Sequence, residues 1–471
     1  MTTAIRWEKE KGLPVHRAPG AKRSAVFAYA EEIDQWLSLH KAERRGGSQE
    51  DSPAQQRSGP SAASSEVAGS RPAPPESWYR SPGLSIFLLS LLIVALGVFA
   101  FWPERGSHQA SGAPQLARRL RFVRMDYEMA EPRGLAVADF NGDKKLDLIA
   151  ASTSRQEATV LLGDAYGGFS RRLGSQTQLG RPEHIVVCDF NGDGKPDIAL
   201  TSYFGGSEIE VLLGNGDGTF WEGTRYDVGG RSRWIACGDL DRDGKPDIVV
   251  GASTAEQLVV LSGNGDGTFR VAGSYEAERD VGAIALADAN GDGWLDVVAC
   301  DYRSALGHSV SVYLNDGTGA LRARKTYETG SGPLGLAVAD LNHDGVPDLV
   351  TANFPRGISV LLGTPGAGFG PHMDYDAGDG NGFVAIADLD RDGEADLVVL
   401  GEHSNTVTLF FGKGDGTFPE QQVLETAGYP DGAIVADFDG DGKLDIAVIN
   451  VNGNSLSIFL NRSPGIARRG N

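Results

Sequence analysis

The sequence has few of the residues that most often carry catalysis or build a disulfide framework. Its 471 residues include only three cysteines, four methionines and eight histidines. The histidines are scattered, and neither an HExxH nor a G-x-S-x-G motif occurs, so nothing predicts an enzyme. Cys188, Cys237 and Cys300 are too few for a disulfide framework, and we expect small apolar residues in strands at these positions.

Basic residues are fewer than acidic ones, and this difference arises entirely from the part of the chain after residue 80. The net charge is −20, yet residues 1–80 hold 12 Lys and Arg against 10 Asp and Glu. The remaining residues carry the whole acidic excess, which makes them poor partners for nucleic acid. This asymmetry indicates two parts in different surroundings. Glycine is abundant, with 64 residues, which is typical of a β-rich protein with many tight turns.

One long apolar run occurs, at residues 84–102, and contains no charged residue. Nineteen helical residues just cross the hydrocarbon core of a bilayer, and Trp78, Tyr79 and Trp102 would lie near its two interfaces. A signal peptide would begin at the N-terminus and have a shorter core. We therefore predict a single transmembrane helix over residues 81–103.

The segments around this helix have little to bury. Residues 46–80 are dominated by Ser, Pro, Ala, Gly and Gln, a composition that predicts a disordered linker. We expect a second linker at 104–118 and a short tail at 462–471. Arginines flank the apolar run on both sides, so charge alone does not fix its orientation.

After residue 118 one acidic motif recurs seven times, at spacings of 48 to 52 residues. An isolated copy would be an ordinary Asn/Asp/Gly turn, but such a regular period indicates a repeat architecture. The copies are DFNGDKKLD from Asp139, DFNGDGKPD from Asp189, DLDRDGKPD from Asp239, DANGDGWLD from Asp288, DLNHDGVPD from Asp340, DLDRDGEAD from Asp388 and DFDGDGKLD from Asp437.

Each copy lies between short runs rich in Val, Ile, Leu and Ala that predict strands. A GNGDGTF-type segment after the third strand predicts a hairpin turn, and no helix pattern follows it that would favour a phosphate-binding loop. Four strands per repeat and seven repeats predict a seven-bladed β-propeller over residues 119–461. The last repeat lacks one strand, which residues 119–128 can supply to close the ring.

The spacing of oxygen-bearing residues within the motif suits calcium, which binds six to eight oxygen ligands. Positions 1, 3, 5 and 9 are Asp or Asn, and position 7 offers its backbone carbonyl. The motif begins like an EF-hand loop, but position 12 is never acidic and the flanks predict strands, which excludes that reading. The predicted ligands are Asp139, Asn141, Asp143, Lys145, Asp147, Asp189, Asn191, Asp193, Lys195, Asp197, Asp239, Asp241, Asp243, Lys245, Asp247, Asp288, Asn290, Asp292, Trp294, Asp296, Asp340, Asn342, Asp344, Val346, Asp348, Asp388, Asp390, Asp392, Glu394, Asp396, Asp437, Asp439, Asp441, Lys443 and Asp445.

These loops, each followed by a VLLGNGDGTF-like stretch, resemble the FG-GAP/VCBS repeats of bacterial surface proteins and the calcium-loop blades of integrin α-subunits. The resemblance covers about residues 119–461. It implies a seven-bladed propeller with calcium in the loop between the first two strands of each blade. Lys144 replaces the usual glycine of the first repeat and is expected to weaken that site. Calcium is expected to be chiefly structural.

The face opposite the calcium loops is the expected ligand face, since aromatic and Arg side chains there would suit a carbohydrate or a protein ligand. The candidates are Tyr203, Phe204, Arg231, Arg233, Tyr302 and Phe354.

Residues 1–45 resemble the second half of the winged helix-turn-helix of MerR and excisionase-like DNA-binding domains. IRWEKEKGLP is similar to the end of a recognition helix, VHRAPGAKRSAVFAY to a basic wing and AEEIDQWL to the closing helix. The helix and turn that should precede Thr2 have no counterpart, so we expect a partial domain, in which either the true start lies upstream or the domain is a remnant. The resemblance implies that DNA phosphates would be contacted by Arg6, Lys9, Lys11, Arg17, Lys22 and Arg23.

The expected fold is thus an all-β seven-bladed propeller, preceded by a small α/β winged-helix-like remnant and one transmembrane helix. The first functional hypothesis is a membrane-anchored, calcium-binding propeller for ligand binding or adhesion outside the cytosol. The alternative is a one-component transmembrane transcriptional regulator with DNA as a partner. Both place the chain in the bacterial inner membrane, with a cytoplasmic N-terminus and an extracytoplasmic propeller.

Overall fold

The computed structural model describes residues 16–17, 26–27, 119–202, 206–278, 280–302, 307–366 and 368–464. The chain divides into two units, Met1–Tyr79 and Arg80–Asn471. In the first unit, β1 (His16–Arg17) pairs antiparallel with β2 (Val26–Phe27), inside the segment predicted to form the wing. The predicted helices of this unit, the transmembrane helix, the linkers and most of the tail lie outside the described residues.

The second unit contains seven four-stranded antiparallel sheets, one for each repeat, so the seven-bladed propeller is confirmed. Within the described residues no helix is long and apolar enough to cross a membrane. From the inner to the outer strand, the sheets are β4 (Pro132–Ala138), β5 (Asp147–Ser152), β6 (Glu157–Gly163) and β7 (Phe169–Gln176); β8 (Pro182–Cys188), β9 (Asp197–Ser202), β10 (Glu208–Leu212) and β11 (Thr224–Asp227); β12 (Ser232–Gly238), β13 (Asp247–Ala252), β14 (Gln257–Gly263) and β15 (Phe269–Glu276); β16 (Val281–Ala287), β17 (Asp296–Asp301), β18 (Ser309–Tyr313) and β19 (Lys325–Glu328); β20 (Pro333–Ala339), β21 (Asp348–Asn353), β22 (Arg356–Leu361) and β25 (Met373–Asp379); β26 (Asn381–Ala387), β27 (Asp396–Gly401), β28 (Thr406–Phe411) and β29 (Glu420–Glu425); and β30 (Pro430–Ala436), β31 (Asp445–Asn450), β32 (Ser455–Asn461) and β3 (Phe122–Glu128).

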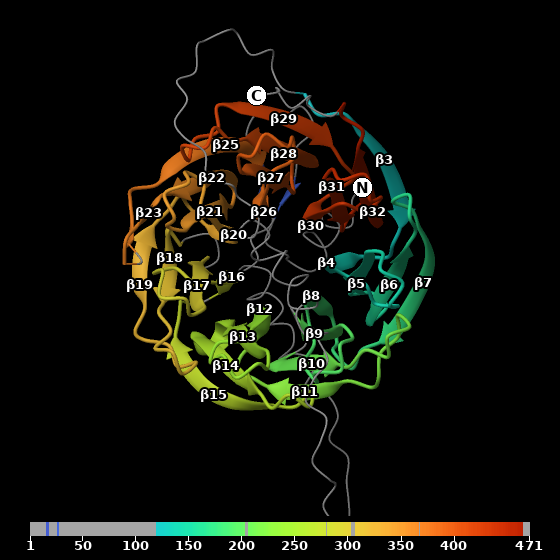
Figure 1. Cartoon of the computed structure of the whole chain (residues 1–471), viewed down its shortest axis with the longest axis vertical. Coiled ribbons are helices and arrows are strands. Elements are labelled where there is room, and N and C mark those ends of the chain that lie inside the picture. The colour runs from blue at the N-terminus through green and yellow to red at the C-terminus, as the bar shows by residue number, and fades with distance from the viewer. Residues whose placement is uncertain are drawn as a thin grey trace, which may run out of the picture. The chain divides into compact units, whose positions relative to one another are not determined.

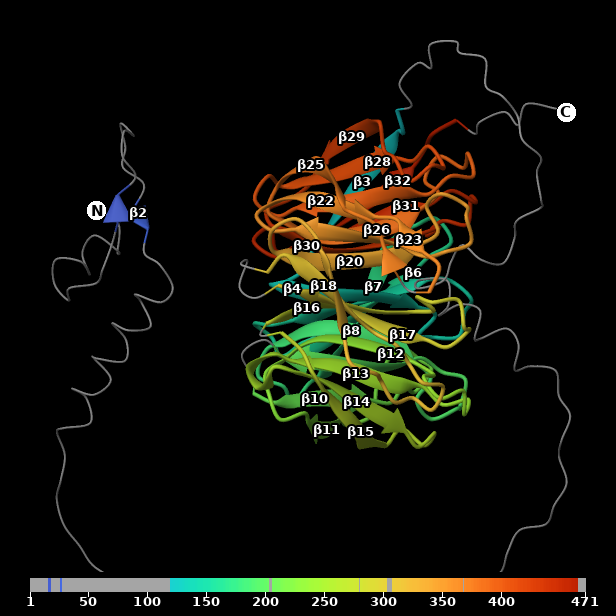
Figure 2. The ribbon, with the colours of Figure 1, turned by 90° about the vertical axis from the view of Figure 1, so that its left-hand side faces the viewer.

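The sheets form a closed ring (Figure 1), with the first strand of each repeat around the axis and the fourth at the outer margin. In the side view (Figure 2) the strands run across the thickness of the ring between two loop-bearing faces. Two short additions break the regularity: a two-stranded pair of β23 (Gly363–Thr364) with β24 (Gly368–Phe369), and the 3₁₀ turn Ser253–Ala255.

The apolar core lies between neighbouring blades. The second strand of every blade is buried along its entire length, because both of its faces are covered by adjacent sheets. One typical cluster joins Ala199 and Ile209 of the second blade to Ile248 and Val259 of the third. Apolar burial therefore stabilises each blade through its neighbours, and an isolated blade would have no complete core.

The ring closes as predicted, because β3 supplies the outer strand of the last blade. It pairs antiparallel with β32 over seven residues, from Phe122 opposite Asn461 to Glu128 opposite Ser455. The two ends of the propeller are also joined: Arg121 donates its backbone N–H to Ser463 Oγ at 2.9 Å and accepts the N–H of Arg462 at 2.7 Å. The ring therefore has no unpaired edge at its junction.

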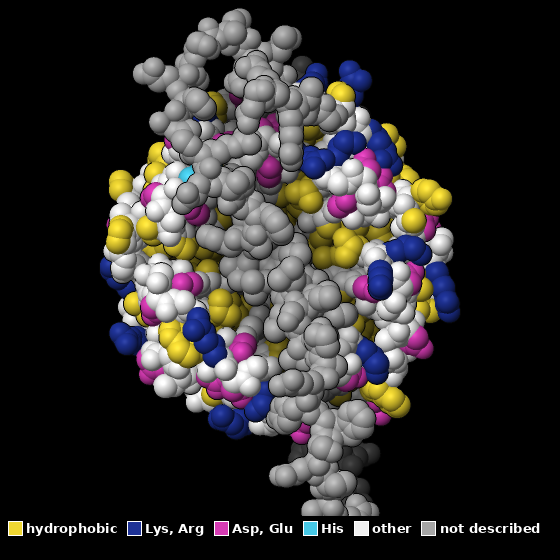
Figure 3. Space-filling view, in the orientation of Figure 1, with side chains coloured by type: hydrophobic (Ala, Val, Ile, Leu, Met, Phe, Trp, Pro, Cys, Tyr) yellow, Lys and Arg dark blue, Asp and Glu magenta, His cyan; other side chains and the backbone are white. Residues whose placement is uncertain are grey.

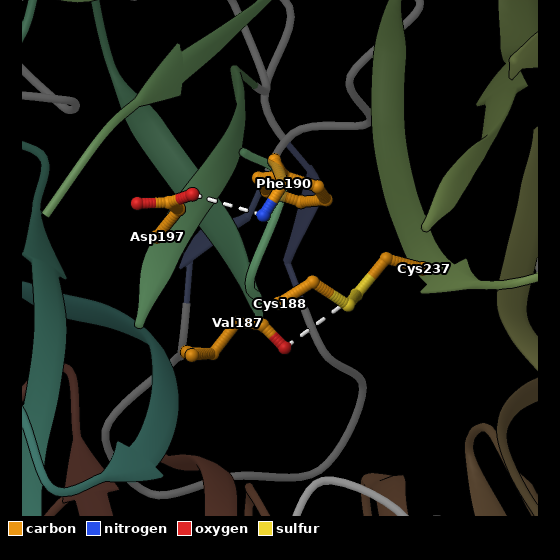
Figure 4. Close-up of a disulfide and its surroundings, with 5 residues drawn as sticks. All are labelled: Val187, Cys188, Phe190, Asp197 and Cys237. Atoms are coloured by element: carbon orange, nitrogen blue, oxygen red, sulfur yellow. Dashed lines mark hydrogen bonds between the residues drawn. A yellow bond between two sulfur atoms is a disulfide. The ribbon is translucent and has the colours of Figure 1, made fainter. Parts of the chain in front are cut away.

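One cysteine prediction was wrong. Cys188 at the end of β8 and Cys237 in β12 form a disulfide that links two neighbouring inner strands (Figure 4). The cysteines are 49 residues apart, about one repeat, and adjacent repeats bring their inner strands together on ring closure. Cys300 is buried and free, as expected for a small apolar residue in a strand.

Removing this disulfide is expected to lower the free energy of unfolding. Closing a loop of about 50 residues restricts the unfolded chain, and native disulfides of this kind typically contribute about 2–4 kcal/mol. The paired substitution Cys188→Ser with Cys237→Ser should show this loss in denaturant unfolding. Reductant should weaken the wild type by a similar amount and leave the double variant unchanged. Equal stability of both proteins under oxidising conditions would contradict the prediction.

Candidate functional site

The seven acidic loops connect the first and second strands of the blades and share one internal hydrogen-bond pattern. In the second repeat, Asp189 at position 1 accepts the backbone N–H of Asp193 at 3.1 Å and of Gly194 at 2.8 Å. Asn191 at position 3 also accepts the Asp193 N–H, at 2.9 Å. Asp193 at position 5 accepts the N–H of Lys195, at 3.0 Å. The side chains thus fold the backbone into a tight turn and hold their own oxygens in it.

The aspartate at position 9 begins the second strand and is fully buried in the second repeat. Asp197 Oδ2 accepts the N–H of Phe190 at 2.9 Å, as Figure 4 shows, and Oδ1 accepts the N–H of Gly214 at 2.7 Å. Burial, with nearby carboxylates such as Asp189, raises the pKa of Asp197 to about 6. This residue therefore joins the loop to the end of the third strand and carries a charge that a bound cation would stabilise.

Three loops bring carboxylate oxygens from positions 1, 3 and 9 within 4.8 Å of one another. These are the repeats whose position 3 is Asp instead of Asn. The strongest effect is in the sixth repeat, where burial and the adjacent Asp390 and Asp392 raise the pKa of Asp396 to about 8. The three groups are Asp239, Asp241 and Asp247; Asp388, Asp390 and Asp396; and Asp437, Asp439 and Asp445.

Position 5 lies outside these three groups, although the sequence predicted it as a ligand beside them. In four repeats its second oxygen accepts from the lysine ammonium at position 7, for example Lys195 Nζ to Asp193 Oδ2 at 3.0 Å. The equivalent pairs are Lys145–Asp143, Lys245–Asp243 and Lys443–Asp441. These pairs are largely solvent-exposed and contribute little to stability, so an ion could compete for the carboxylate.

The donor set fits calcium. It contains carboxylate and amide oxygens only, in a loop whose side chains already converge, and calcium accepts such hard oxygen ligands in varied geometries. Positions 1, 3 and 9 would hold the ion, and position 5 would join when its lysine moves away. The carbonyl of position 7 remains a predicted ligand.

Position 6 of the loop requires a left-handed backbone, with φ of +79° at Gly194 and +66° at Lys144. A Cβ at Gly194 would meet no atom within 4 Å, so only the backbone conformation opposes a side chain there.

We expect Gly194→Ala to lower the free energy of unfolding by about 1 kcal/mol, because alanine disfavours the left-handed conformation. Lys144→Ala, where the same conformation already carries a Cβ, is the matched control and should change it little. Chemical denaturation at saturating calcium measures both, and equal losses would contradict the explanation.

Neighbouring loops also contact one another around the ring. The Arg242 guanidinium lies 4.3 Å from the ring centroid of Trp294 in the next loop. His343 Nε2 lies 2.6 Å from Glu394 Oε2 of the loop after it. Backbone hydrogen bonds also connect neighbouring blades: the N–H of Gly218 in the second blade donates to the carbonyl of Phe140 in the first acidic loop at 2.9 Å. The shape of one loop therefore affects the blade beside it.

The opposite face contains the second candidate site, a small pocket of about 180 Å³ on the axis of the ring. Three residues predicted for the ligand face line it together, namely Arg233, Tyr302 and Phe354. Arg231 does not line it, and Tyr203 and Phe204 lie outside the described residues. The residues that the sequence prediction missed are Arg133, Glu183, His184, Trp234, Leu334, Gly382, Glu402, Tyr429 and Asp431.

Four of the missed residues share one position in the repeat with the predicted Arg233. Arg133, Glu183, Arg233, Leu334 and Asp431 each follow the first residue of an inner strand. Aligning the repeats at this position would have shown charged residues where a buried inner strand should carry small ones. That signal was present in the sequence but lies well before each conspicuous acidic motif.

The pocket contains one ion pair, between Arg133 and Asp431, and two further carboxyl groups, Glu183 and Glu402. Arg133 Nη1 donates to Asp431 Oδ1 at 2.8 Å. Burial raises the pKa of Glu183 to about 7 and that of Glu402 to about 7, despite the opposing effect of the arginines. The rings of His184 and Trp234 stack with centroids 3.9 Å apart. The pocket is therefore a polar site rather than a gap in the apolar core.

On the face seen in Figure 3, beyond the residues drawn in grey, basic and acidic side chains are interspersed around the rim. Of the residues predicted to contact DNA, only Arg17 falls in a described strand, and its side chain is not described. Arg6, Lys9, Lys11, Lys22 and Arg23 lie outside the described residues.

Several solved structures are similar to this chain. BBS1N in complex with ARL6DN, soaked with mercury, is 11% identical, covers 74% of this chain and 99% of its own, and has a TM-score of 0.52. An Agrocybe aegerita lectin that recognises non-reducing terminal N-acetylglucosamine is 21% identical, with 67% and 88% covered and a TM-score of 0.44. Virginiamycin B lyase from Staphylococcus aureus with quinupristin is 13% identical, with 72% and 99% covered and a TM-score of 0.49. At these identities the likeness extends to the fold alone.

A comparison with curated proteins gives no match. The FG-GAP-like repeat, in contrast, matches residues 139–200, 189–250, 239–299, 288–351 and 388–448. Each match begins at the first aspartate of an acidic loop, and together they cover more than half of the chain. The chain therefore belongs to the family of FG-GAP-like repeat proteins.

Proposed function

We propose that this protein is a membrane-anchored, calcium-binding propeller that binds a ligand, or mediates adhesion, outside the cytosol. The observation that carries the proposal is the convergence of buried and half-buried carboxylates in three of the seven loops, within 4.8 Å of one another. Like charges at that distance repel, and a divalent cation is the simplest compensation. We further propose a binding role for the axial pocket, where Arg133 and Asp431 already pair with each other.

An extracytoplasmic location has two further supports. Calcium sites in extracellular modules typically bind with dissociation constants of about 10⁻⁴–10⁻³ M, which calcium outside the cytosol can fill. The disulfide between Cys188 and Cys237 is of a kind that persists in oxidising compartments and is rare in the cytosol. The apolar run at residues 84–102 would anchor the propeller to the bacterial inner membrane, with the N-terminus in the cytoplasm.

Protease protection tests the location directly. The full chain, with one tag at each terminus, is expressed in a bacterial host, and protease is added to intact spheroplasts. We expect loss of the C-terminal tag and protection of the N-terminal tag until the membrane is lysed. Protection of both tags, or loss of the N-terminal tag alone, would contradict the proposal.

A transmembrane regulator is the second candidate, favoured by the antiparallel pair β1–β2 in the segment expected to form a DNA-binding wing. In that case the propeller would sense a ligand outside and residues 1–45 would bind DNA inside. Recovery of specific DNA fragments with the cross-linked full chain, lost when Arg17, Lys22 and Arg23 are changed to Ala, would support it. Recovery no greater than that of this variant would exclude it.

A further inference from the structure

The axial pocket is built by the whole ring. Side chains from all seven blades line it, from Arg133 in the first to Asp431 in the last. Its volume of about 180 Å³ is below the ~300–1,000 Å³ of sites for drug-sized ligands, so it suits one small unit. The acidic loops lie at the other ends of the same inner strands, which makes this pocket distinct from the metal sites.

Two polar groups of the pocket have no hydrogen-bond partner. Glu183 is only 3% exposed, and its Oε2 accepts from no donor; the indole Nε1–H of Trp234 has no acceptor. Leaving such a group buried and unpaired costs about 1–3 kcal/mol. The stacked ring of His184 restricts movement of the Trp234 ring. One unpaired acceptor and one unpaired donor on adjacent blades match a ligand hydroxyl, which both donates and accepts.

The remaining charges of the pocket already have partners. Arg133 pairs with Asp431, and the Tyr429 hydroxyl bonds Glu402. The Arg233 guanidinium lies 5.8 Å from the ring centroid of Tyr302. A ligand cation would face two guanidinium groups, and a ligand anion would face three carboxyl groups. A neutral ligand avoids both repulsions.

Part of the pocket lining is apolar, since Leu334 and Phe354 contribute to it. A ligand that satisfies both the polar and the apolar lining residues carries hydroxyl groups and C–H groups on one compact ring, as a pyranose does. We propose that the axial pocket binds one neutral sugar residue, such as the terminal unit of a glycan. This deepens the proposed ligand-binding function and rests on it.

Saturation-transfer NMR on the full chain in detergent, with 5 mM calcium, tests the assignment. The probes are the methyl glycosides of glucose, galactose, mannose and N-acetylglucosamine, with ethylamine and acetate as charged comparisons. We expect at least one glycoside to bind and its affinity to fall at least tenfold in Glu183→Gln and in Trp234→Phe. Trp221→Phe, at an exposed tryptophan outside the pocket, is the matched control and should bind as the wild type does.

The possible results distinguish failure of the sugar assignment from failure of the proposed calcium-binding function. Failure of all four glycosides, binding of ethylamine or acetate in their place, or glycoside binding unchanged in both pocket variants would each overturn the sugar assignment. Thermal melts verify that the variants fold, and either variant alone suffices for the test. Melts with and without calcium accompany the titrations: calcium stabilisation without glycoside binding rejects only the pocket assignment, whereas absent calcium stabilisation rejects the calcium-binding function itself.

Discussion

Removing calcium is expected to lower the melting temperature of the propeller by more than ~10 °C. When the free calcium concentration is tenfold above the dissociation constant of a site, binding at that site raises the free energy of unfolding by about 1.4 kcal/mol. Seven such sites would contribute about 10 kcal/mol, and each kcal/mol moves the melting temperature of a large domain by about 2–4 °C. Even partial occupancy therefore gives a large effect. The measurement is a circular-dichroism melt in 5 mM calcium and again in excess chelator.

The geometry of the acidic loops also predicts which ions stabilise the propeller and which substitutions remove that stabilisation. Magnesium at the same concentration should stabilise less, because it demands a more regular octahedral site. Asp388→Asn in the sixth loop, at position 1, which is Asp in every repeat, should reduce both the number of bound ions and the calcium-induced gain in melting temperature. Asp266→Asn is the matched control, because Asp266 holds the Thr268 hydroxyl in a hairpin turn and belongs to none of the three convergent carboxylate groups. Superimposable melts in calcium and chelator would show that the loops bind no calcium that stabilises the fold.

Deleting residues 119–128 should abolish the cooperative, monomeric fold. The deletion removes β3, with its seven paired residues, and exposes the edge of β32 along its length. It also removes Met125 and Tyr127, which pack on the apolar cluster between the first and last blades. An unpaired apolar edge promotes association with other chains. We expect oligomers in light scattering and a broadened melt.

Two comparisons make this deletion informative. Deletion of residues 465–471, beyond the last strand, is the control and should leave a monomer with an unchanged melt. A peptide of residues 119–128 added to the deleted chain should restore the monomer by adding a strand to the free edge. A monomeric deletion variant that melts within a few degrees of the wild type would show that β3 is dispensable.

The repeat period was sufficient to predict the blades and their closure. Seven acidic motifs at nearly constant spacing define seven equivalent units, and the missing strand of the last unit requires residues such as Phe122–Glu128 to complete it. The reason is physical: each blade buries its faces only against its neighbours, so period, strand number and closure depend on one another.

The prediction was incomplete where side chains meet across blades. Cys188 and Cys237 are one repeat apart in sequence, and only the ring places them in contact. Arg133 and Asp431 are 298 residues apart and meet because the ring closes. Within a single loop, the prediction also missed the Lys195–Asp193 pair, because the motif alone does not specify the side-chain conformations inside the turn.

The junction of the propeller also sets the direction in which it is displayed. Arg121 and Arg462 are bonded to each other, and the Arg462 guanidinium contacts Asp439 and Asp441 of the last acidic loop. The chain therefore enters and leaves the ring on the face that carries the acidic loops. Any tether that precedes residue 119 pulls on this face, so the axial pocket opens on the side away from the point of attachment. A load on the tether would act first on β3, the strand that locks the ring.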